Sequence, residues 1–249
     1  MYKKLFSCYL LFALFLSCGI SAQNVQMHYD FGRSLYNKDL SKRPLWTSTV
    51  EDFVPDKWGS TYSFIDIYYQ RDGVSGAYWE FGRDLNITNN KQFAAHVEYN
   101  GGLNSDETTW QATRFQHAVL AGPAWNWHNH DYSSTFTVQT LYKYYFKNRH
   151  YHAHPYNSFQ LTEVWGFQLA HHLVTLSGFC DTWYDPHVNG KWIITSQPQW
   201  WINLNAIKGC EVPLSLGGEV EISNNFVYND YGRNNRFYAI PTMALKWTF

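Results

Sequence analysis

The sequence predicts an all-β protein, a 12-stranded antiparallel transmembrane β-barrel, and three observations support this prediction. Its strand-like segments run for about 10–12 residues, enough to cross a bilayer at a tilt, whereas strands of soluble proteins average about 5–6 residues. Most segments alternate apolar with polar side chains, so these strands have one apolar face and one hydrophilic face. The number of segments is even, which returns both ends of the wall to the same side of the membrane.

The final segment, Phe237–Phe249, carries the clearest alternation. Every second residue counted back from the end is apolar: Phe249, Trp247, Leu245, Met243, Pro241, Ala239 and Phe237. Such a strand could end a soluble sandwich, but an exposed apolar edge promotes aggregation, whereas in a barrel the last strand pairs with the first. We therefore expect this segment to close a barrel. The terminal Phe249 also resembles the aromatic signal that the barrel-assembly machinery reads, which makes that machinery an expected partner.

Twelve segments read as strands, and two of them depart from the pattern. The twelve are Val25–Gly32, Leu45–Val54, Thr61–Gln70, Ser75–Leu85, Phe93–Gly101, Thr113–Ala124, Thr135–Phe146, Ser158–Gln168, His172–Tyr184, Trp192–Leu204, Leu214–Asn224 and Phe237–Phe249. In Thr113–Ala124 the alternation is too weak to orient the strand, and a turn is expected over Trp125–Tyr132. In Ser158–Gln168, Glu163 falls in phase with apolar residues, which aims it at lipid unless a bulge turns it inward.

The N-terminus has the pattern of a secretory signal peptide. Lys3 and Lys4 precede the apolar run Leu5–Leu16, and the small residue Ala22 suits a signal peptidase. We expect residues 1–22 to be removed and residues 23–249 to form one outer-membrane barrel of a Gram-negative cell, surrounded by lipid. Lipidation at Cys18 is an open but weaker alternative, because the preceding residues form a poor lipobox.

Composition agrees with this location. Aromatic residues make up 19% of the chain, a surplus that the interfacial girdles of a barrel would use. The formal net charge of -1 gives no basic face for nucleic acid, so we expect no nucleic-acid partner. After cleavage two cysteines remain, Cys180 and Cys210. An oxidising periplasm would let them pair, but their expected places, mid-strand and in a turn, favour free thiols.

Several motifs carry a resemblance to a known clan. They are the strand Asp66-Ile67-Tyr68-Tyr69 followed by Tyr78-Trp79-Glu80-Phe81, the hairpin Phe159–Asp185 with its end Gly178–Trp183, and the aromatic closing strand. With the signal peptide they resemble the Tsx-type nucleoside-specific channels, which are twelve-stranded outer-membrane barrels. The chain is more similar still to a family of exported proteins in that clan described only as a domain of unknown function. The resemblance covers nearly the whole mature chain and implies a passive channel for a small polar solute such as a nucleoside.

A pore that selects a base or sugar needs aromatic faces and polar edges along its lumen. Inward positions of the expected strands supply both, and we predict that these residues line the pore: Phe64, Asp66, Tyr68, Tyr78, Glu80, His96, Glu98, Gln139, Lys143, Glu219 and Glu221. The acidic members should face a few basic residues such as Lys143 and Arg83. We expect no cofactor, because no Gly-rich phosphate loop occurs in the sequence, and we assign no metal ligand.

Three other functions stay open. Small barrels often fill their interiors with charge networks that conduct nothing, so a plugged structural or receptor barrel is the main alternative. An outer-membrane lipid-modifying hydrolase would need a His and a Ser two residues apart on a lipid-facing strand, and the sequence has no such pair. The alternating histidines His150, His152 and His154, and also His128 and His130, suit a zinc or copper site, but histidine spacing alone is weakly specific.

Overall fold

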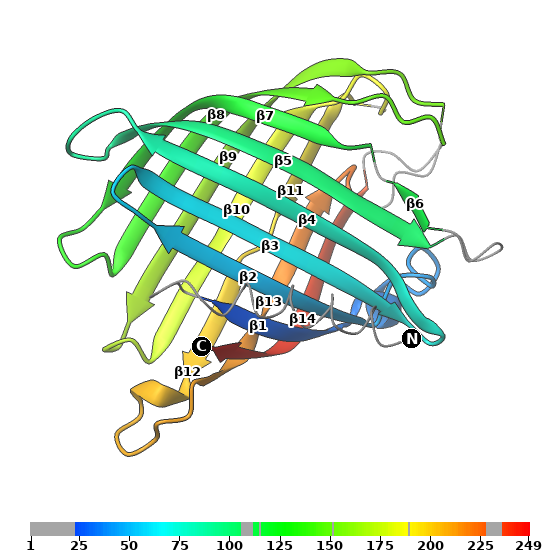
Figure 1. The fold of residues 1–249 in the computed structure, drawn as a ribbon. Coiled ribbons are helices and arrows are strands. Elements are labelled where there is room, and N and C mark those ends of the chain that lie inside the picture. Colours follow the sequence, from blue (N-terminus) through cyan, green and yellow to red (C-terminus); the bar gives the residue numbers. More distant parts are fainter. Residues whose placement is uncertain (1–22, 106–111, 115, 151, 189, 228–235) are drawn as a thin grey trace, which may run out of the picture.

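A computed structural model describes residues 23–105, 112–114, 116–150, 152–188, 190–227 and 236–249. It is an all-β structure, a closed antiparallel barrel of 12 strands with one extra strand and almost no helix. Figure 1 shows the strands tilted around one ring, with the first strand beside the last. The expected signal peptide lies outside the described residues. Among the described residues, no helix combines the length and the apolar character that a membrane span needs.

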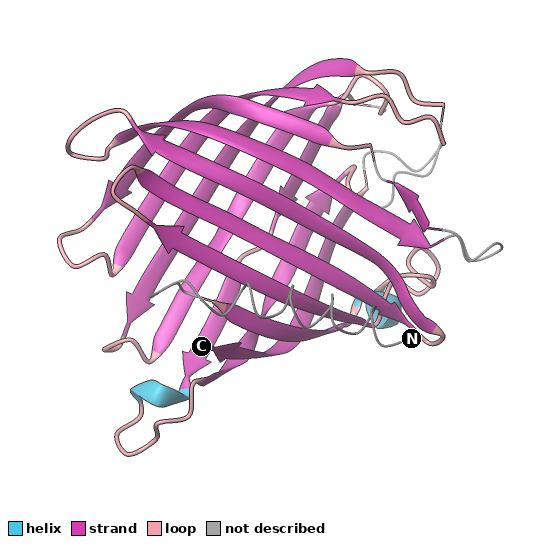
Figure 2. Ribbon diagram, in the orientation of Figure 1, coloured by secondary structure: helices cyan, strands magenta, loops and turns pink. Residues whose placement is uncertain are grey.

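The wall strands agree closely with the predicted segments. They are β1 (Asn24–Asp30), β2 (Trp46–Pro55), β3 (Gly59–Gln70), β4 (Gly73–Asn86), β5 (Phe93–Ser105), β7 (Ala118–His128), β8 (Ser134–Tyr145), β9 (Tyr156–Leu169), β10 (Val174–Tyr184), β11 (Trp192–Ser196) with β12 (Gln199–Asn203), β13 (Leu214–Asn224) and β14 (Phe237–Thr248). The extra strand is β6 (Ala112–Arg114), which pairs with β5. The two short helical turns in Figure 2 are α2 (Gly32–Leu35) and η1 (Leu204–Ala206).

Pairing of β1 with β14 closes the ring. Their register runs from Asn24 opposite Thr248 to Asp30 opposite Thr242. Beyond this ladder, the Phe249 amide donates to the Gln23 carbonyl oxygen at 3.0 Å. The predicted closing role of the last segment is thereby confirmed. In lipid an unpaired strand edge would leave backbone groups unsatisfied, so this contact is a condition for spanning the membrane.

The strands β11 and β12 form one wall strand. Both keep the same register against β10 and against β13, and only Gln197 and Pro198 lie between them. Proline has no N–H to donate to the ladder. The Pro198 carbonyl oxygen still accepts a hydrogen bond from the Val220 amide at 3.0 Å, so the wall stays continuous. The single predicted segment Trp192–Leu204 was therefore correct.

One predicted boundary was wrong. The sixth wall strand is β7, Ala118–His128, which starts and ends later than the predicted Thr113–Ala124 and uses part of the expected turn. Over residues 118–124 its inward side chains are small or apolar, and Ala118, Leu120 and Ala124 are each about 1% exposed. Both faces of this first part of the strand are apolar, so the period of two has no polar phase to mark where the strand begins.

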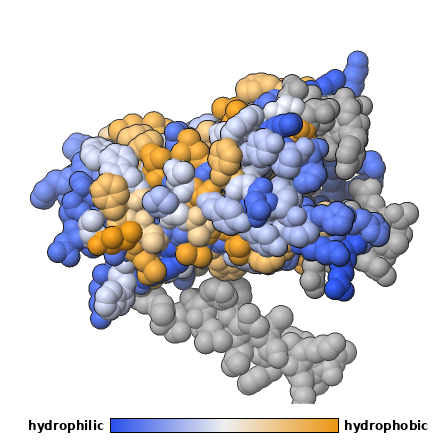
Figure 3. All heavy atoms as spheres, turned by 90° about the horizontal axis from the view of Figure 1, so that it is seen from above, coloured by the Kyte–Doolittle hydropathy of each residue, from blue (hydrophilic) through white to orange (hydrophobic). Residues whose placement is uncertain are grey.

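The outer face of the barrel is apolar in its middle. Along β5, Phe93 and Val97 are 49% and 52% exposed, whereas Ala94 and His96 between them are 0% and 6% exposed. Figure 3 shows orange, hydrophobic side chains gathered between two blue, hydrophilic ends. This arrangement is the one that a bilayer requires.

The two ends of the barrel differ. We call the end with Asn24 and Thr248 the termini end, where turns such as residues 56–58 and 129–133 connect the strands. The opposite, loop end carries longer connections, including residues 31–45 and 185–191. The labelled C-terminus lies at the termini end in Figure 1.

Two further sequence predictions concern single residues. Glu163 pairs in register with Val138 and Cys180, with no shift of register in β9, so it keeps the outward phase. No bulge turns it inward, and it lies half-buried in the middle of the strand. Cys180 and Cys210 are both free, as expected.

A glycine substitution tests the packing of the wall. A Cβ on Gly122 would lie 2.1 Å from the backbone oxygen of Thr140 on the neighbouring strand. Gly122→Val should therefore force β7 and β8 apart and destabilise the barrel by about 1–3 kcal/mol. The measurement is the fraction of protein that migrates as the compact form on an unheated denaturing gel after urea titration. The control is Ala121→Val on the exposed face of the same strand, which should leave that fraction unchanged. Equal stability of the two variants would contradict the packing described here.

Candidate functional site

The candidate site is a cavity of about 360 Å³ inside the barrel. Most of its lining comes from the middle of the strands and from their halves nearer the termini end. Seven of the predicted pore residues line it: Phe64, Asp66, Glu80, His96, Glu98, Gln139 and Glu219. They come from β3, β4, β5, β8 and β13, so strand alternation alone brings them to one space.

The other four predicted residues do not line this cavity. Tyr68, Tyr78, Lys143 and Glu221 lie on the same inward faces but closer to the loop end. Tyr78 still reaches the site, because its hydroxyl donates to the Glu80 carboxylate at 2.6 Å. Lys143 donates to the side-chain oxygen of Gln160 at 2.7 Å. These residues lie at the loop-end border of the cavity.

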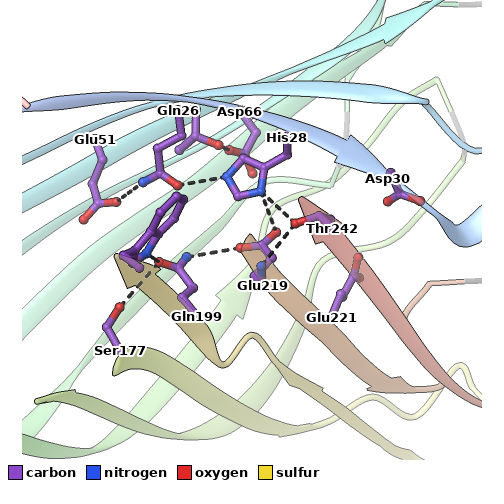
Figure 4. A network of polar contacts seen from close by, with 12 residues as sticks. Gln26, His28, Asp30, Glu51, Asp66, Ser177, Gln199, Glu219, Glu221 and Thr242 are labelled. Atoms are coloured by element: carbon purple, nitrogen blue, oxygen red, sulfur yellow. Dashed lines mark hydrogen bonds and ion pairs between the residues drawn. The ribbon is translucent and has the colours of Figure 1, made fainter. Parts of the chain in front are cut away.

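One polar network joins β1 to its neighbours on both sides (Figure 4). Gln26 donates to Glu51 at 3.0 Å and is hydrogen-bonded to His28 at 2.9 Å. The other ring nitrogen of His28 lies 2.9 Å from the Thr242 hydroxyl. In the sequence, Gln26, His28 and Asp30 alternate with apolar residues and so mark this face as polar. Glu51 lies in the segment Leu45–Val54, whose alternation is less regular and does not show which way Glu51 points.

The same network continues on β12 and β13. Gln199 donates to Glu219 at 3.1 Å and accepts from the indole N–H of Trp201 at 3.1 Å. Trp201 is completely buried beside the lumen. Figure 4 shows Glu219 of β13 beside His28 of β1, a strand far away in the sequence. Such networks hold the wall strands in register.

A second network surrounds His96. Its Nδ1 lies 2.7 Å from an Asp84 carboxylate oxygen, and its Nε2 lies 3.1 Å from Glu98. Gln139 approaches the same Nδ1 at 3.1 Å. Asp84 is inward because it is in phase with Glu80 and Gly82, a signal that was present in the sequence but was not used. Both ring nitrogens of His96 are occupied, so the side chain is fixed in place.

A third network crosses β8, β9 and β10. Besides accepting from Lys143, Gln160 donates to Thr162 at 2.9 Å, and Thr162 donates to Asp181 at 2.6 Å. Gln160, Thr162 and Asp181 all line the cavity. Hydrogen bonds from neutral groups thus orient an inward carboxyl group.

Arg83 does not face the lumen, so this part of the prediction was wrong. Gly82 and Asp84 line the cavity, and Arg83 between them points to the outer rim of the termini end. There it donates to Thr61 at 3.0 Å and forms an ion pair with Asp56 at 2.8 Å. Hydrogen bonds from Arg83 hold the pKa of Asp56, an exposed turn residue, at about 2. The cation that sequence reasoning placed in the pore therefore stabilises a turn.

At the loop end, the segment 31–45 folds against the inner wall. Arg43 forms ion pairs with Asp30 at 2.8 Å and with Glu221. Leu40, only 2% exposed, packs in an apolar cluster with Tyr238 and Ile240 of β14. These contacts narrow the loop end from within, and the sequence showed this segment only as a polar loop.

Removing the Arg43 side chain should loosen this segment. Breaking a buried ion pair costs roughly 3–5 kcal/mol, so Arg43→Ala should speed amide hydrogen exchange across residues 31–45 by at least about tenfold. Lys38→Ala removes an exposed cation from the same segment and is the matched control. Unchanged exchange in Arg43→Ala would contradict an anchoring role for these ion pairs.

The described residues contain no group of three His, Cys, Asp or Glu side chains arranged to hold a metal ion. The lumen instead offers hydrogen-bond acceptors beside aromatic faces. Tyr62, Phe64 and Tyr78 follow one another with ring centroids 5.9 Å and 6.0 Å apart. Such an arrangement can bind a small polar molecule without changing it chemically.

Several solved structures are similar to the chain at low sequence identity. The chain is similar to LpxR from Salmonella typhimurium, with 9% identity, a TM-score of 0.47, and coverage of 92% of this chain and 100% of that one. It is also similar to the Acinetobacter baumannii outer membrane protein Omp33, with 8% identity, a TM-score of 0.39, and coverage of 92% and 97%. A membrane protein from a study of in-meso crystallization matches with 10% identity, a TM-score of 0.41, and coverage of 92% and 84%.

No curated protein sequence matches the chain. One family model does, and it spans residues 22–249, which is the whole of the barrel. The chain therefore belongs to the family described as domain of unknown function DUF5020.

Proposed function

We propose that the protein is a passive outer-membrane channel for small polar solutes, with nucleosides as the class that the sequence resemblance suggests. The observation that carries this proposal is the polar cavity inside a closed barrel, lined by side chains from most of the wall strands. Pores select solutes through their diameter and through the donors and acceptors on their walls. The outer-membrane location and the reading of Phe249 by the barrel-assembly machinery belong to the same proposal.

The cavity offers complementary contacts to a nucleoside. Phe64 presents an aromatic face on which a base could stack. Asp66 and Glu80 lie on the same side of the lumen and present oxygen atoms that could accept hydrogen bonds from ribose hydroxyls. No bond to the solute has to form or break, so transport follows the concentration gradient and needs no cofactor.

A plugged structural or receptor barrel is the second candidate, and a specific observation favours it. Apolar side chains fill parts of the loop end, where Val188 packs against Trp183 and Ile193, and Leu40 packs against β14. In the channel proposal these loop segments move aside during passage. In the plug proposal they stay in place.

Liposome efflux separates the two candidates. Liposomes loaded with uridine and containing the purified protein should release it faster than protein-free liposomes, and Arg43→Ala should increase the rate because its loop is less firmly held. Release at the protein-free rate by both the wild type and Arg43→Ala, with the compact form intact on gels, would contradict a channel.

Phe64 provides a test of stacking. One aromatic face contributes roughly 1 kcal/mol, so Phe64→Ala should raise the uridine concentration that half-blocks ion conductance in planar bilayers by about fivefold. The control is Phe81→Ala, which removes the same side chain from an exposed position on the outer face of β4. An equal effect of the two substitutions would show that Phe64 does not contact the solute.

A further inference from the structure

The cavity lining has a strong excess of acidic over basic side chains. Seven carboxyl side chains line the cavity: Glu51, Asp66, Glu80, Asp84, Glu98, Asp181 and Glu219. Among the described residues of the same lining, His96 is the one basic side chain, and two of those carboxylates already hold it. A concave site lined by one sign of charge concentrates ions of the opposite sign.

Nearby cations of the inner wall do not fill this space. Lys143 donates to Gln160 and lies 4.5 Å from the centre of the Trp183 ring, toward the loop end. Lys246 lies 4.0 Å from the centre of the Trp201 ring, and Arg43 pairs with carboxylates outside the lining. The cations of the inner wall therefore lie beside the cavity or nearer the loop end, whereas acidic side chains surround the cavity.

An independent observation concerns Asn100. This residue is 7% exposed and lies on the inward face of β5, two positions beyond Glu98 and opposite Glu80 in register, so it borders the cavity on the side of the loop end and is not part of the lining itself. Its side-chain oxygen is buried without a hydrogen-bond partner. A buried acceptor without a donor costs about 1–3 kcal/mol, so this corner of the wall lacks a donor. Ionised carboxylates cannot supply one, because they only accept.

We propose that the cavity prefers solutes that carry a protonated amine, which would lie beside Glu80, Glu98 and Asn100. An ammonium group supplies three donors and a positive charge, which is what the two carboxylates and the amide oxygen lack. Phe64 in the lining and Tyr78 at its border, with ring centroids 6.0 Å apart, add aromatic faces that attract a cation. This inference rests on the proposed function, because it names the class of solute that the same cavity takes.

Three sugars of similar size test the preference. Glucosamine carries a protonated amine, glucose is neutral and glucuronate is an anion. Liposomes that contain the wild-type protein should release glucosamine fastest and glucuronate slowest, with a ratio of roughly tenfold or more between the two. The double variant Glu80→Gln with Glu98→Gln should lower that ratio severalfold, because it removes the two carboxyl groups beside the proposed amine site. Glu163→Gln removes a carboxyl group from the outer face and should leave the ratio unchanged.

Binding of the same three sugars to the protein in micelles, measured by calorimetry, gives a second readout. If the wild type binds glucosamine preferentially and the double variant binds it less tightly, the inference is supported. This holds even if no sugar is released from the liposomes, because absence of release would overturn only the channel. Equal release of the three sugars together with equal binding overturns the charge preference and leaves the channel standing. An undiminished preference in the double variant, with the compact form intact on gels, overturns the assignment to Glu80 and Glu98.

Discussion

Every other property of this barrel depends on the pairing of its first strand with its last. A bilayer offers no water to backbone N–H and C=O groups, so a sheet that spans it has to leave no open edge. The ladder between β1 and β14 meets this condition and brings Asn24 and Thr248 to the same end. Once the ring is closed, the alternation of side chains has a physical meaning. One phase has to suit lipid, and the other phase has to fill or line the interior.

The interior is divided along the barrel axis. Near the loop end, Leu40 and Val188 bring apolar side chains inward from the connections. In the middle and toward the termini end, polar networks and the cavity take their place. His28 and His96 each use both ring nitrogens in these networks, so the lining is held in fixed positions. A fixed lining can discriminate between solutes, because its acceptors do not have to reorganise for each one.

Much of the fold followed from the sequence, because a period of two is a local signal. This alternation did not give the correct bounds for the predicted segment Thr113–Ala124. The strand found there is β7, and its inward residues Ala118 and Leu120 are as apolar as its outward ones. Pro198 interrupts one ladder, yet the register continues across it, so its segment was still recognised as one strand. Strand phase also placed Glu163 on the outer face.

The site was only partly predictable from the sequence. The phase of a strand shows whether a side chain points inward or outward, but it does not show the position of that side chain along the barrel axis or its hydrogen-bond partners. Tyr68 and Glu221 share the inward phase with the cavity residues but lie nearer the loop end. Arg43 joins carboxylates 13 and 178 residues away in the sequence, and no local pattern encodes such contacts. Arg83 was expected in the pore because of its charge. Its position between Gly82 and Asp84, which point inward, would have predicted correctly that Arg83 points outward.

The most direct test of this account is the accessibility of nitroxide labels placed singly along residues 93–100 of β5 in lipid bilayers. A label at an inward position, such as His96 or Glu98, should collide with a water-soluble relaxing agent. A label at an outward position, such as Ala95 or Val97, should collide with oxygen dissolved in the lipid. The account predicts strict alternation with a period of two. Uniform accessibility to one agent, or the opposite phase, would contradict a lipid-facing wall around a polar interior.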